Sequence, residues 1–245
     1  RQSNPLERSR EIGQLYSADA ITTVSHAEQR FIKTLVNVPS TIVGHALPSR
    51  APSAVPDFAA RTGILFVAGF GGIMYYNGDA VWYFMSRIYP LVVASLPRGS
   101  SPIPVTIAGR GIPRALRTMA RTSEWNSSIS IVESPRDIAP LYDSHRVVVV
   151  PHQYTTGVQY KLSEAMAAGV AVVASKISAE ALDLAALQSR KAVCLGETAA
   201  QLARCVVRLH SSQRAWRLHR DGALGFIADT HRPEDIASAL KTAVG

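Results

Sequence analysis

The chain has 245 residues, of which 47% are hydrophobic and 18% charged, with a formal net charge of +8 at pH 7. This length can bury one sizeable core plus part of a second, and the composition is globular rather than disordered or fibrous. The uncharged apolar run from Ala165 to Ala174 is about half of the roughly 20 residues that a membrane-spanning helix needs, so no span is predicted.

The positive charge favours an anionic partner such as a nucleotide, an acidic membrane surface or nucleic acid. The Lys and Arg residues are scattered and form no aromatic and basic platform, so nucleic acid is the least favoured of the three. Cys194 and Cys205 lie outside any Cys-x-x-Cys motif and have no His at a ligand spacing. We therefore expect neither a disulfide framework nor a zinc site, and a cytoplasmic, reducing location.

The first residues are charged rather than apolar and the chain opens on Arg1, so we interpret it as a piece of a longer protein. Four short elements are predicted before residue 46: helices over 4–16 and 27–35, and strands over 21–25 and 40–44. Because four elements are too few for an independent domain, residues 1–45 are expected to be the remnant of an N-terminal Rossmann domain. Residues 46–63 are rich in Pro, Ser and Ala without periodicity, which indicates a linker.

Residues 64–245 alternate between apolar, β-branched runs and helical patterns. Six strands are predicted, over 64–67, 104–108, 129–132, 146–150, 171–174 and 191–195. Helices are predicted over 79–91, from Asp137 onward, and over 233–244. Near-continuous apolar strands are typical of a parallel sheet covered on both faces, so the fold class is α/β, a doubly wound Rossmann-like sheet.

One strand, loop and helix junction carries charge in an otherwise apolar segment. The strand ends at Pro151, and a helix over 158–168 is predicted to end at Gly169. The exposed N–H groups of such a helix start are where α/β proteins hold phosphates. Lys161 and Glu164 are three positions apart, so they share one helix face near this crevice. A solvated ion pair on an ordinary helix would show the same spacing.

The stretch GVQYKLSEAMAAGVAVVAS, residues 157–175, resembles the donor-binding signature of the group 1 (family 4, retaining) glycosyltransferases, which have the B-type two-Rossmann fold. Four further parts of the chain resemble that family in the same order: 17–32, 66–70 with 77–84, 105–111 and 131–151. The resemblance covers nearly the whole chain and implies a C-terminal donor-binding domain over 64–245, preceded by the tail of the N-terminal acceptor-side domain.

The resemblance also implies residue roles. Glu164 is expected to accept hydrogen bonds from the ribose and Lys161 to stand beside the diphosphate, and these two are the expected catalytic residues. Further nucleotide-sugar contacts are expected from Gly69, Phe70, Gly109, Arg110, Val132, Glu133, Thr155, Thr156, Gly157 and Val158. Arg110 as a surface arginine and Glu133 as a solvated loop residue are the open alternatives.

Two departures from the family pattern concern the sugar and the diphosphate. Thr156 stands where the family often has a Glu that contacts the sugar, and the loop GFGGIMYYN, residues 69–77, lacks the usual Arg and Lys. Lys161 and Arg110 would then have to hold the diphosphate between them.

The resemblance implies transfer of a sugar from a nucleotide-diphosphate sugar with retention, without a metal or other cofactor. The acceptor would be a glycan or a lipid-linked glycan in polysaccharide biosynthesis, and the chain alone would be inactive without its upstream domain. The positive charge is consistent with peripheral contact at the anionic inner membrane face. The alternatives are a sugar-nucleotide epimerase of the same architecture and a degenerate domain that binds a nucleotide or a partner without turnover.

Overall fold

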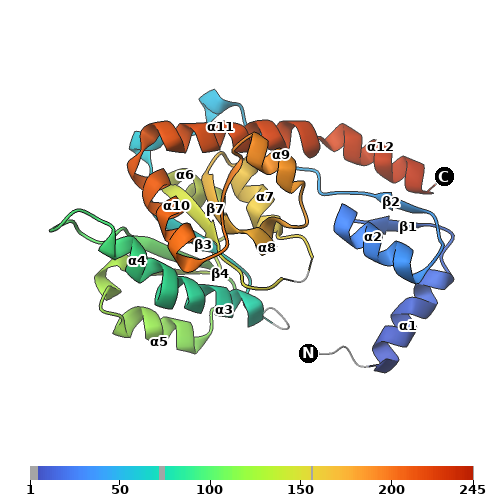
Figure 1. Cartoon of the computed structure of the whole chain (residues 1–245), viewed down its shortest axis with the longest axis horizontal. Coiled ribbons are helices and arrows are strands. Elements are labelled where there is room, and N and C mark those ends of the chain that lie inside the picture. The colour runs from blue at the N-terminus through green and yellow to red at the C-terminus, as the bar shows by residue number, and fades with distance from the viewer. Residues whose placement is uncertain (1–4, 72–74, 156, 245) are drawn as a thin grey trace.

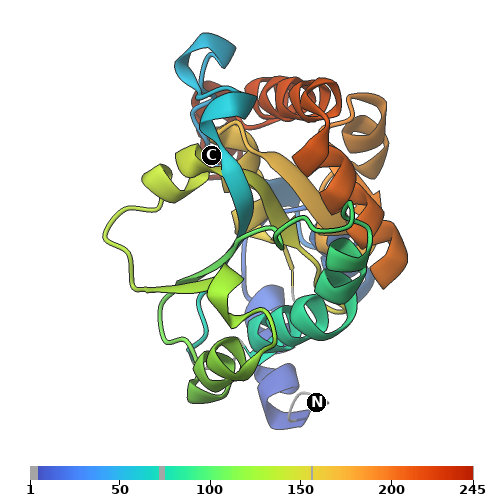
Figure 2. The same cartoon turned by 90° about the vertical axis from the view of Figure 1, so that its left-hand side faces the viewer.

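The computed structural model describes residues 5–71, 75–155 and 157–244. Its main body is a six-stranded parallel sheet with helices on both faces (Figures 1 and 2), in the order β5-β4-β3-β6-β7-β8. The strands are β3 (Thr62–Val67), β4 (Val105–Gly109), β5 (Ile129–Glu133), β6 (His145–Val150), β7 (Ala171–Ser175) and β8 (Val193–Gly196). The doubly wound sheet predicted from the alternating apolar runs is confirmed, and all six strands lie where they were predicted to within a few residues.

Two apolar cores form because successive strand residues point to opposite faces of the sheet. Ile64 and Phe66 of β3 belong to one core, and Leu65 between them belongs to the other. The helices that cover the first face are α3 (Tyr75–Tyr83), α4 (Tyr89–Ala94), α5 (Arg114–Thr122) and α10 (Ala199–Ser211). Those that cover the second are α6 (Ala139–Ser144), α7 (Tyr160–Ala167), α9 (Leu184–Ser189) and α11 (Gln213–Thr230), with the short α8 (Lys176–Ala179) after β7.

The helix predicted over 79–91 is present and extends beyond both ends of that range. A π-helical segment, η3 (Phe84–Ile88), joins α3 to α4. Pro90 follows directly in the first turn of α4, and a proline cannot donate a backbone hydrogen bond, so the wider turn before it accommodates the missing donor.

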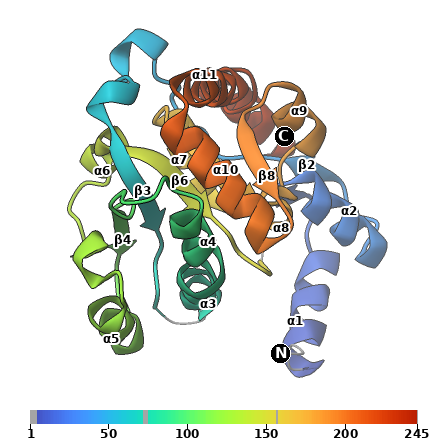
Figure 3. The same cartoon turned by 60° about the vertical axis from the view of Figure 1, so that its left-hand side comes forward.

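The elements before residue 46 form a small separate layer (Figure 1). Helices α1 (Pro5–Tyr16) and α2 (His26–Leu35) flank a two-stranded parallel sheet of β1 (Ile21–Thr23) and β2 (Ser40–Ile42). The final helix α12 (Pro233–Val244) leaves the main body and packs on β2 (Figure 1), and the side chain of Ile236 lies next to Gly44. Figure 3 shows α1, α2 and β2 to one side of the main body. All four early elements and the last helix match the sequence prediction.

Three short 3-10 turns are present. One, η4 (Asn126–Ser128), precedes β5, and the other two, η1 (Pro52–Ala54) and η2 (Phe58–Ala60), lie in the segment 46–63. The segment is attached to the main body through two arginines. Arg50 forms an ion pair with Asp143 at 2.6 Å, and the buried guanidinium of Arg61 donates to the carbonyl of His145 at 3.2 Å and, within the segment, to that of Pro56 at 2.9 Å. These contacts provide partners for backbone carbonyls that would otherwise be buried without any.

The expectation of two unpaired cysteines is wrong: Cys194 and Cys205 form a disulfide, with their Cα atoms 5.9 Å apart. Cys194 is in β8 and Cys205 is in α10. The helix runs back along the strand after a tight connection, which brings Cys205 next to Cys194. The spacing of the two cysteines in the sequence does not reveal that the helix packs along the strand in this way. The argument for a reducing compartment, which rested on unpaired thiols, is removed with it.

None of the helices in the described ranges combines the length and the apolarity needed to span a bilayer.

Candidate functional site

The sheet has a topological switch point between β3 and β6. From β3 the chain moves outward to β4 and β5, and from β6 it moves the opposite way to β7 and β8. In open α/β sheets, ligands bind in the crevice at the carboxyl ends of the two strands where this reversal occurs. Asn77 follows β3 on α3, while His152 and Lys161 follow β6, so all three are placed at this crevice.

These three side chains form one hydrogen-bonded cluster. The Nζ of Lys161 donates to Oδ1 of Asn77, and Nε2 of His152 lies 2.8 Å from the same oxygen. The Nδ2 of Asn77 donates to the carbonyl of Gly69 at 2.6 Å, which ties the cluster to the chain just beyond β3. Asn77 and His152 are only 2% and 1% exposed, so the cluster is a fixed, buried support for the half-buried Lys161.

The contacts determine which member of the cluster carries charge. The Oδ1 atom of Asn77 can only accept hydrogen bonds. The proton between the two side chains is therefore bonded to Nε2 of His152. Burial and the neighbouring Lys161 lower the pKa of His152 to about 3, so the ring is neutral at physiological pH. Burial lowers the pKa of Lys161 to about 8, which leaves it mostly protonated at pH 7. Lys161 is therefore the one cation of this cluster.

Lys161 and Glu164 do not form the solvated ion pair that the spacing alone would allow. Lys161 donates to Asn77, and Glu164 has no ion pair among the residues that the structure describes. The other residues of α7 after Tyr160 are buried, and Lys161 and Glu164 form its half-buried face. Burial raises the pKa of Glu164, as expected for a carboxylate without a cationic partner.

The start of α7 has no side-chain cap, and its first and third N–H groups, of Tyr160 and Leu162, donate to the carbonyls of Val158 and Gln159 at 3.1 and 2.9 Å. The helix begins at Tyr160, two residues later than predicted, and its N-cap residue Gln159 makes no side-chain cap hydrogen bond. Gly157 has φ +83°, a left-handed conformation that favours glycine, and Val158 follows it half-buried. Thr155 accepts a hydrogen bond from Nε2 of Gln159, which shapes the loop. Thr156 lies outside the described residues.

The ends of β3 and β4 approach each other very closely. Gly109 has φ +156°, and a Cβ there would lie 1.7 Å from the carbonyl oxygen of Ala68, so only glycine fits. The N–H of Phe70 donates to the carbonyl of Arg110 at 2.9 Å, which extends the pairing past both strands. Phe70 is buried, whereas the side chain of Arg110 is exposed and is among none of the ion pairs found in the described part of the chain.

Glu133 is exposed at the end of the edge strand β5, next to the half-buried Val132, and its carboxylate is held by neighbouring groups. It accepts from the N–H of Gly111 at 2.9 Å and forms an ion pair with Arg117 at 2.5 Å. Loss of water raises the pKa of this carboxyl, but the Gly111 N–H and Arg117 outweigh that effect and hold the pKa below its ordinary value. Glu133 is therefore more than a solvated loop residue. It closes one end of a groove of about 740 Å³ between α5 and β5.

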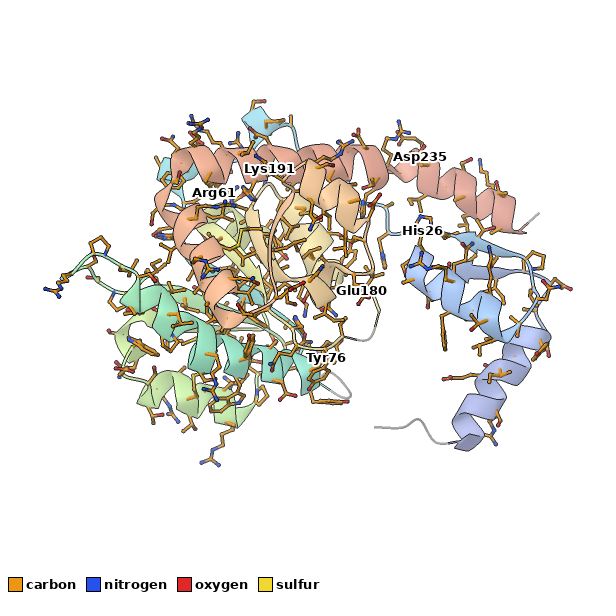
Figure 4. The ribbon with its side chains drawn as sticks, viewed as in Figure 1. His26, Arg61, Tyr76, Glu180, Lys191 and Asp235 are labelled. Carbon is orange, nitrogen blue, oxygen red and sulfur yellow. A yellow bond between two sulfur atoms is a disulfide. The ribbon has the colours of Figure 1, made fainter. Side chains whose placement is uncertain are left out.

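A smaller hollow of about 330 Å³ lies between the early elements and the main body. Val24, Ser25 and Glu28 line it on one side, and Thr155 and Gly157 line it on the other. Figure 4 labels His26, which begins α2, and Glu180, which follows α8, on the two sides of this hollow. The loop before α7 thus faces both the switch point and the early elements.

Sequence analysis gave no role to Asn77 or His152, the two buried residues that hold Lys161. Both stand in segments that were recognised, and a signal was available. His152 is a polar residue directly after a predicted strand, and Asn77 lies in the segment between another predicted strand and the helix that follows it, at the edge of the sheet where ligands bind.

Within 5–71, 75–155 and 157–244, no group of three His, Cys, Asp or Glu side chains is arranged to hold a metal ion.

Comparison with known proteins identifies the family. The sequence profile described as "Glycosyl transferases group 1" matches residues 63–212, which is more than half of the chain. The chain belongs to the group 1 glycosyltransferases. No curated protein sequence matches this group 1 glycosyltransferase chain.

Solved structures agree on the fold. The crystal structure of TarM superposes with a TM-score of 0.77 at 14% identity, covering 97% of this chain and 46% of that one. A mutant of S. aureus TarM in complex with fondaparinux, α-GlcNAc-glycerol and UDP gives a TM-score of 0.79 at 12% identity, covering 99% and 48%. WaaG, described as a glycosyltransferase involved in lipopolysaccharide biosynthesis, gives 0.65 at 13%, covering 91% and 62%. This group 1 chain thus has the fold of one part of a two-Rossmann glycosyltransferase, and it spans roughly half to two thirds of the length of these proteins.

Proposed function

We propose that this chain binds the nucleotide-diphosphate sugar donor of a retaining, metal-independent glycosyltransferase. The observation that carries the proposal is the position of Lys161, a single supported cation at the switch point beside the uncapped start of α7. A diphosphate placed there would meet both the ammonium and the positive end of the dipole of α7. Glu164, one turn later on the same half-buried face, would accept hydrogen bonds from the ribose hydroxyls.

Chemically, the arrangement favours a leaving nucleoside diphosphate. Negative charge develops on the diphosphate as its bond to the sugar breaks, and Lys161 and the helix start are fixed in advance where they would stabilise it. The neutral His152 does not add a second cation, so the charge on Lys161 sets the strength of this effect. Gly69 is exposed just past β3 and has no side chain to obstruct a donor, and Arg110 can swing toward the donor from the surface.

The proposed acceptor is a glycan or a lipid-linked glycan, and residues 1–45 are proposed to belong to the acceptor side of the complete enzyme. We propose that the whole enzyme works in polysaccharide biosynthesis at the cytoplasmic face of the membrane, and that turnover requires the acceptor-side domain. The net charge of +8 is consistent with contact to an anionic membrane.

Isothermal titration with UDP, GDP and their sugars tests the donor proposal. UDP is the first nucleotide to try, because a mutant of TarM, which is similar in fold, has been crystallised with UDP. The expected result is saturable binding of one nucleotide that weakens about tenfold or more in Glu164→Gln, since a ribose hydrogen bond to a charged group is lost. Glu124→Gln, which changes an exposed loop carboxylate, should bind like wild type. If no nucleotide binds the folded chain, the donor proposal is wrong for this chain.

A further inference from the structure

A ladder of aromatic rings runs from the buried cluster to the surface at the carboxyl edge of the sheet. Tyr76, labelled in Figure 4 near the start of α3, lies with its ring centroid 5.9 Å from that of His152. Tyr75 is 6.4 Å from Tyr76, and Tyr154, from the loop after β6, is 6.4 Å from Tyr75. Two segments that are far apart in the sequence thus bring three tyrosines together, next to the buried cluster of Asn77, His152 and Lys161.

The outer two rings are open to solvent. Tyr75 is 54% exposed and Tyr154 is 42% exposed, although both are large side chains that gain free energy from burial. An exposed aromatic pair next to a functional cleft is typical of a binding surface. Tyrosine is suited to this role because it offers a rigid, amphipathic face and loses little conformational entropy when a ligand covers it.

The charge at this pair selects the type of ligand. The hydroxyl of Tyr154 donates to the carboxylate of Asp79, so the rim of the pair carries an anion. A carboxylate disfavours the phosphates of a nucleotide or of anionic lipid, but it accepts hydrogen bonds from hydroxyl groups. Flat aromatic faces beside a carboxylate that can accept hydrogen bonds from hydroxyl groups match a neutral pyranose ring. The C–H groups of such a ring are attracted to the negative face of the π-system.

We propose that Tyr75 and Tyr154, supported by Tyr76 and assisted by Asp79, form a stacking platform for a neutral pyranose ring of the acceptor glycan. The inference rests on the proposed transfer to a glycan and extends it by placing part of the acceptor site on the donor-binding domain. A sugar on this platform lies beside the crevice that holds Asn77 and Lys161, which brings an acceptor hydroxyl close to the proposed donor.

The test uses 19F NMR on the full chain labelled with 3-fluorotyrosine, with Tyr75 and Tyr154 assigned by substitution to Phe. The probes are maltotriose, cellotriose, chitotriose, UDP and phosphatidylglycerol vesicles. At least one oligosaccharide should shift both resonances saturably. Tyr75→Ala and Tyr154→Ala should each weaken that binding about fivefold, the loss expected of one aromatic contact. Tyr75→Trp should preserve it, and Trp82→Ala, which removes an exposed ring elsewhere on α3, should leave it unchanged.

Several results would overturn the platform. One is the absence of a saturable shift with all three oligosaccharides in a folded sample. Another is a response of both tyrosines to vesicles or to UDP but not to sugars, which would assign the pair to a membrane or to a nucleobase. Failure of UDP to bind anywhere counts against the proposed donor site alone, because the sugar-induced shifts are measured without nucleotide.

Discussion

The Nζ of Lys161 donates a hydrogen bond to Oδ1 of Asn77, which lies 84 positions earlier in the chain. The same amide group contacts His152 and the carbonyl of Gly69, so it connects the segments that follow the two central strands. A single buried asparagine therefore holds the one cation of this cluster in position at the switch point.

Substitution of Asn77 by Asp keeps the shape of the side chain but places a negative charge beside Lys161. UDP affinity should fall about tenfold, because the ammonium is neutralised before the diphosphate arrives. The unfolding free energy should fall by about 1–3 kcal/mol, since the donor to the Gly69 carbonyl is lost. Calorimetry and urea denaturation measure the two effects. Asn126→Asp, at an exposed asparagine, is the control, and wild-type UDP affinity in Asn77→Asp would contradict the role of this contact.

The pKa of Lys161, lowered to about 8 by burial, predicts how nucleotide binding depends on pH. Below that value the ammonium is charged and attracts the diphosphate, and above it the charge is lost. UDP affinity should therefore decrease as the pH rises from 7 to 9, by up to about tenfold if only the protonated lysine binds. Titrations across this range should show no such decrease in Lys161→Met. An equal decrease in both proteins would mean that another group is responsible.

Gly109→Ala should be among the most destabilising small substitutions in the chain. The new Cβ would lie 1.7 Å from the Ala68 carbonyl oxygen, so the ends of β3 and β4 would have to separate. We expect a loss of more than about 3 kcal/mol in urea denaturation. Gly78→Ala is the matched control, because it lies in α3 with no atom within 4 Å of its added Cβ. That substitution should be neutral or stabilise by about 0.5–1 kcal/mol, and similar losses at both positions would refute the close approach.

The Cys194–Cys205 disulfide should contribute to stability without affecting the proposed donor site. Closing a loop of 11 residues should stabilise the fold by roughly 3 kcal/mol on the chain-entropy account. Urea denaturation with and without reductant measures the difference, and the double variant Cys194→Ala with Cys205→Ala should match the reduced protein. Two titratable thiols in the native, unreduced protein would show that the bond does not form.

The strands and most helices could be predicted because their signals are local. Runs such as Val147 to Val150 are apolar at every position, which only a strand covered on both faces requires. The final helix starts at Pro233 with Glu234 and Asp235 in its first turn, as helix starts commonly do. Helices α5, α8, α9 and α11 were not predicted. For α8 and α9 the reason is that each spans fewer than two full turns and shows little periodicity.

The contacts that support the site could not be predicted because they join distant segments. The placement of Lys161 and Glu164 on one half-buried face followed from their spacing. The choice of Asn77 as the partner of Lys161, the burial of His152 and the pairing of Tyr75 with Tyr154 depend on how the loops after β3 and β6 meet. The missed disulfide has the same cause, since only the return of α10 along β8 brings its two cysteines together.

Titration of UDP at pH 7 into wild type, Lys161→Met and Lys176→Met tests the central claim most directly. Lys176 is the matched control because it is an exposed lysine that pairs with Glu197 at the same edge of the sheet. We expect saturable binding to wild type and Lys176→Met, and a loss of at least about tenfold in Lys161→Met, where a charge-assisted contact to the diphosphate is removed. Equal UDP affinity in all three proteins would contradict the assignment of Lys161 to the donor diphosphate.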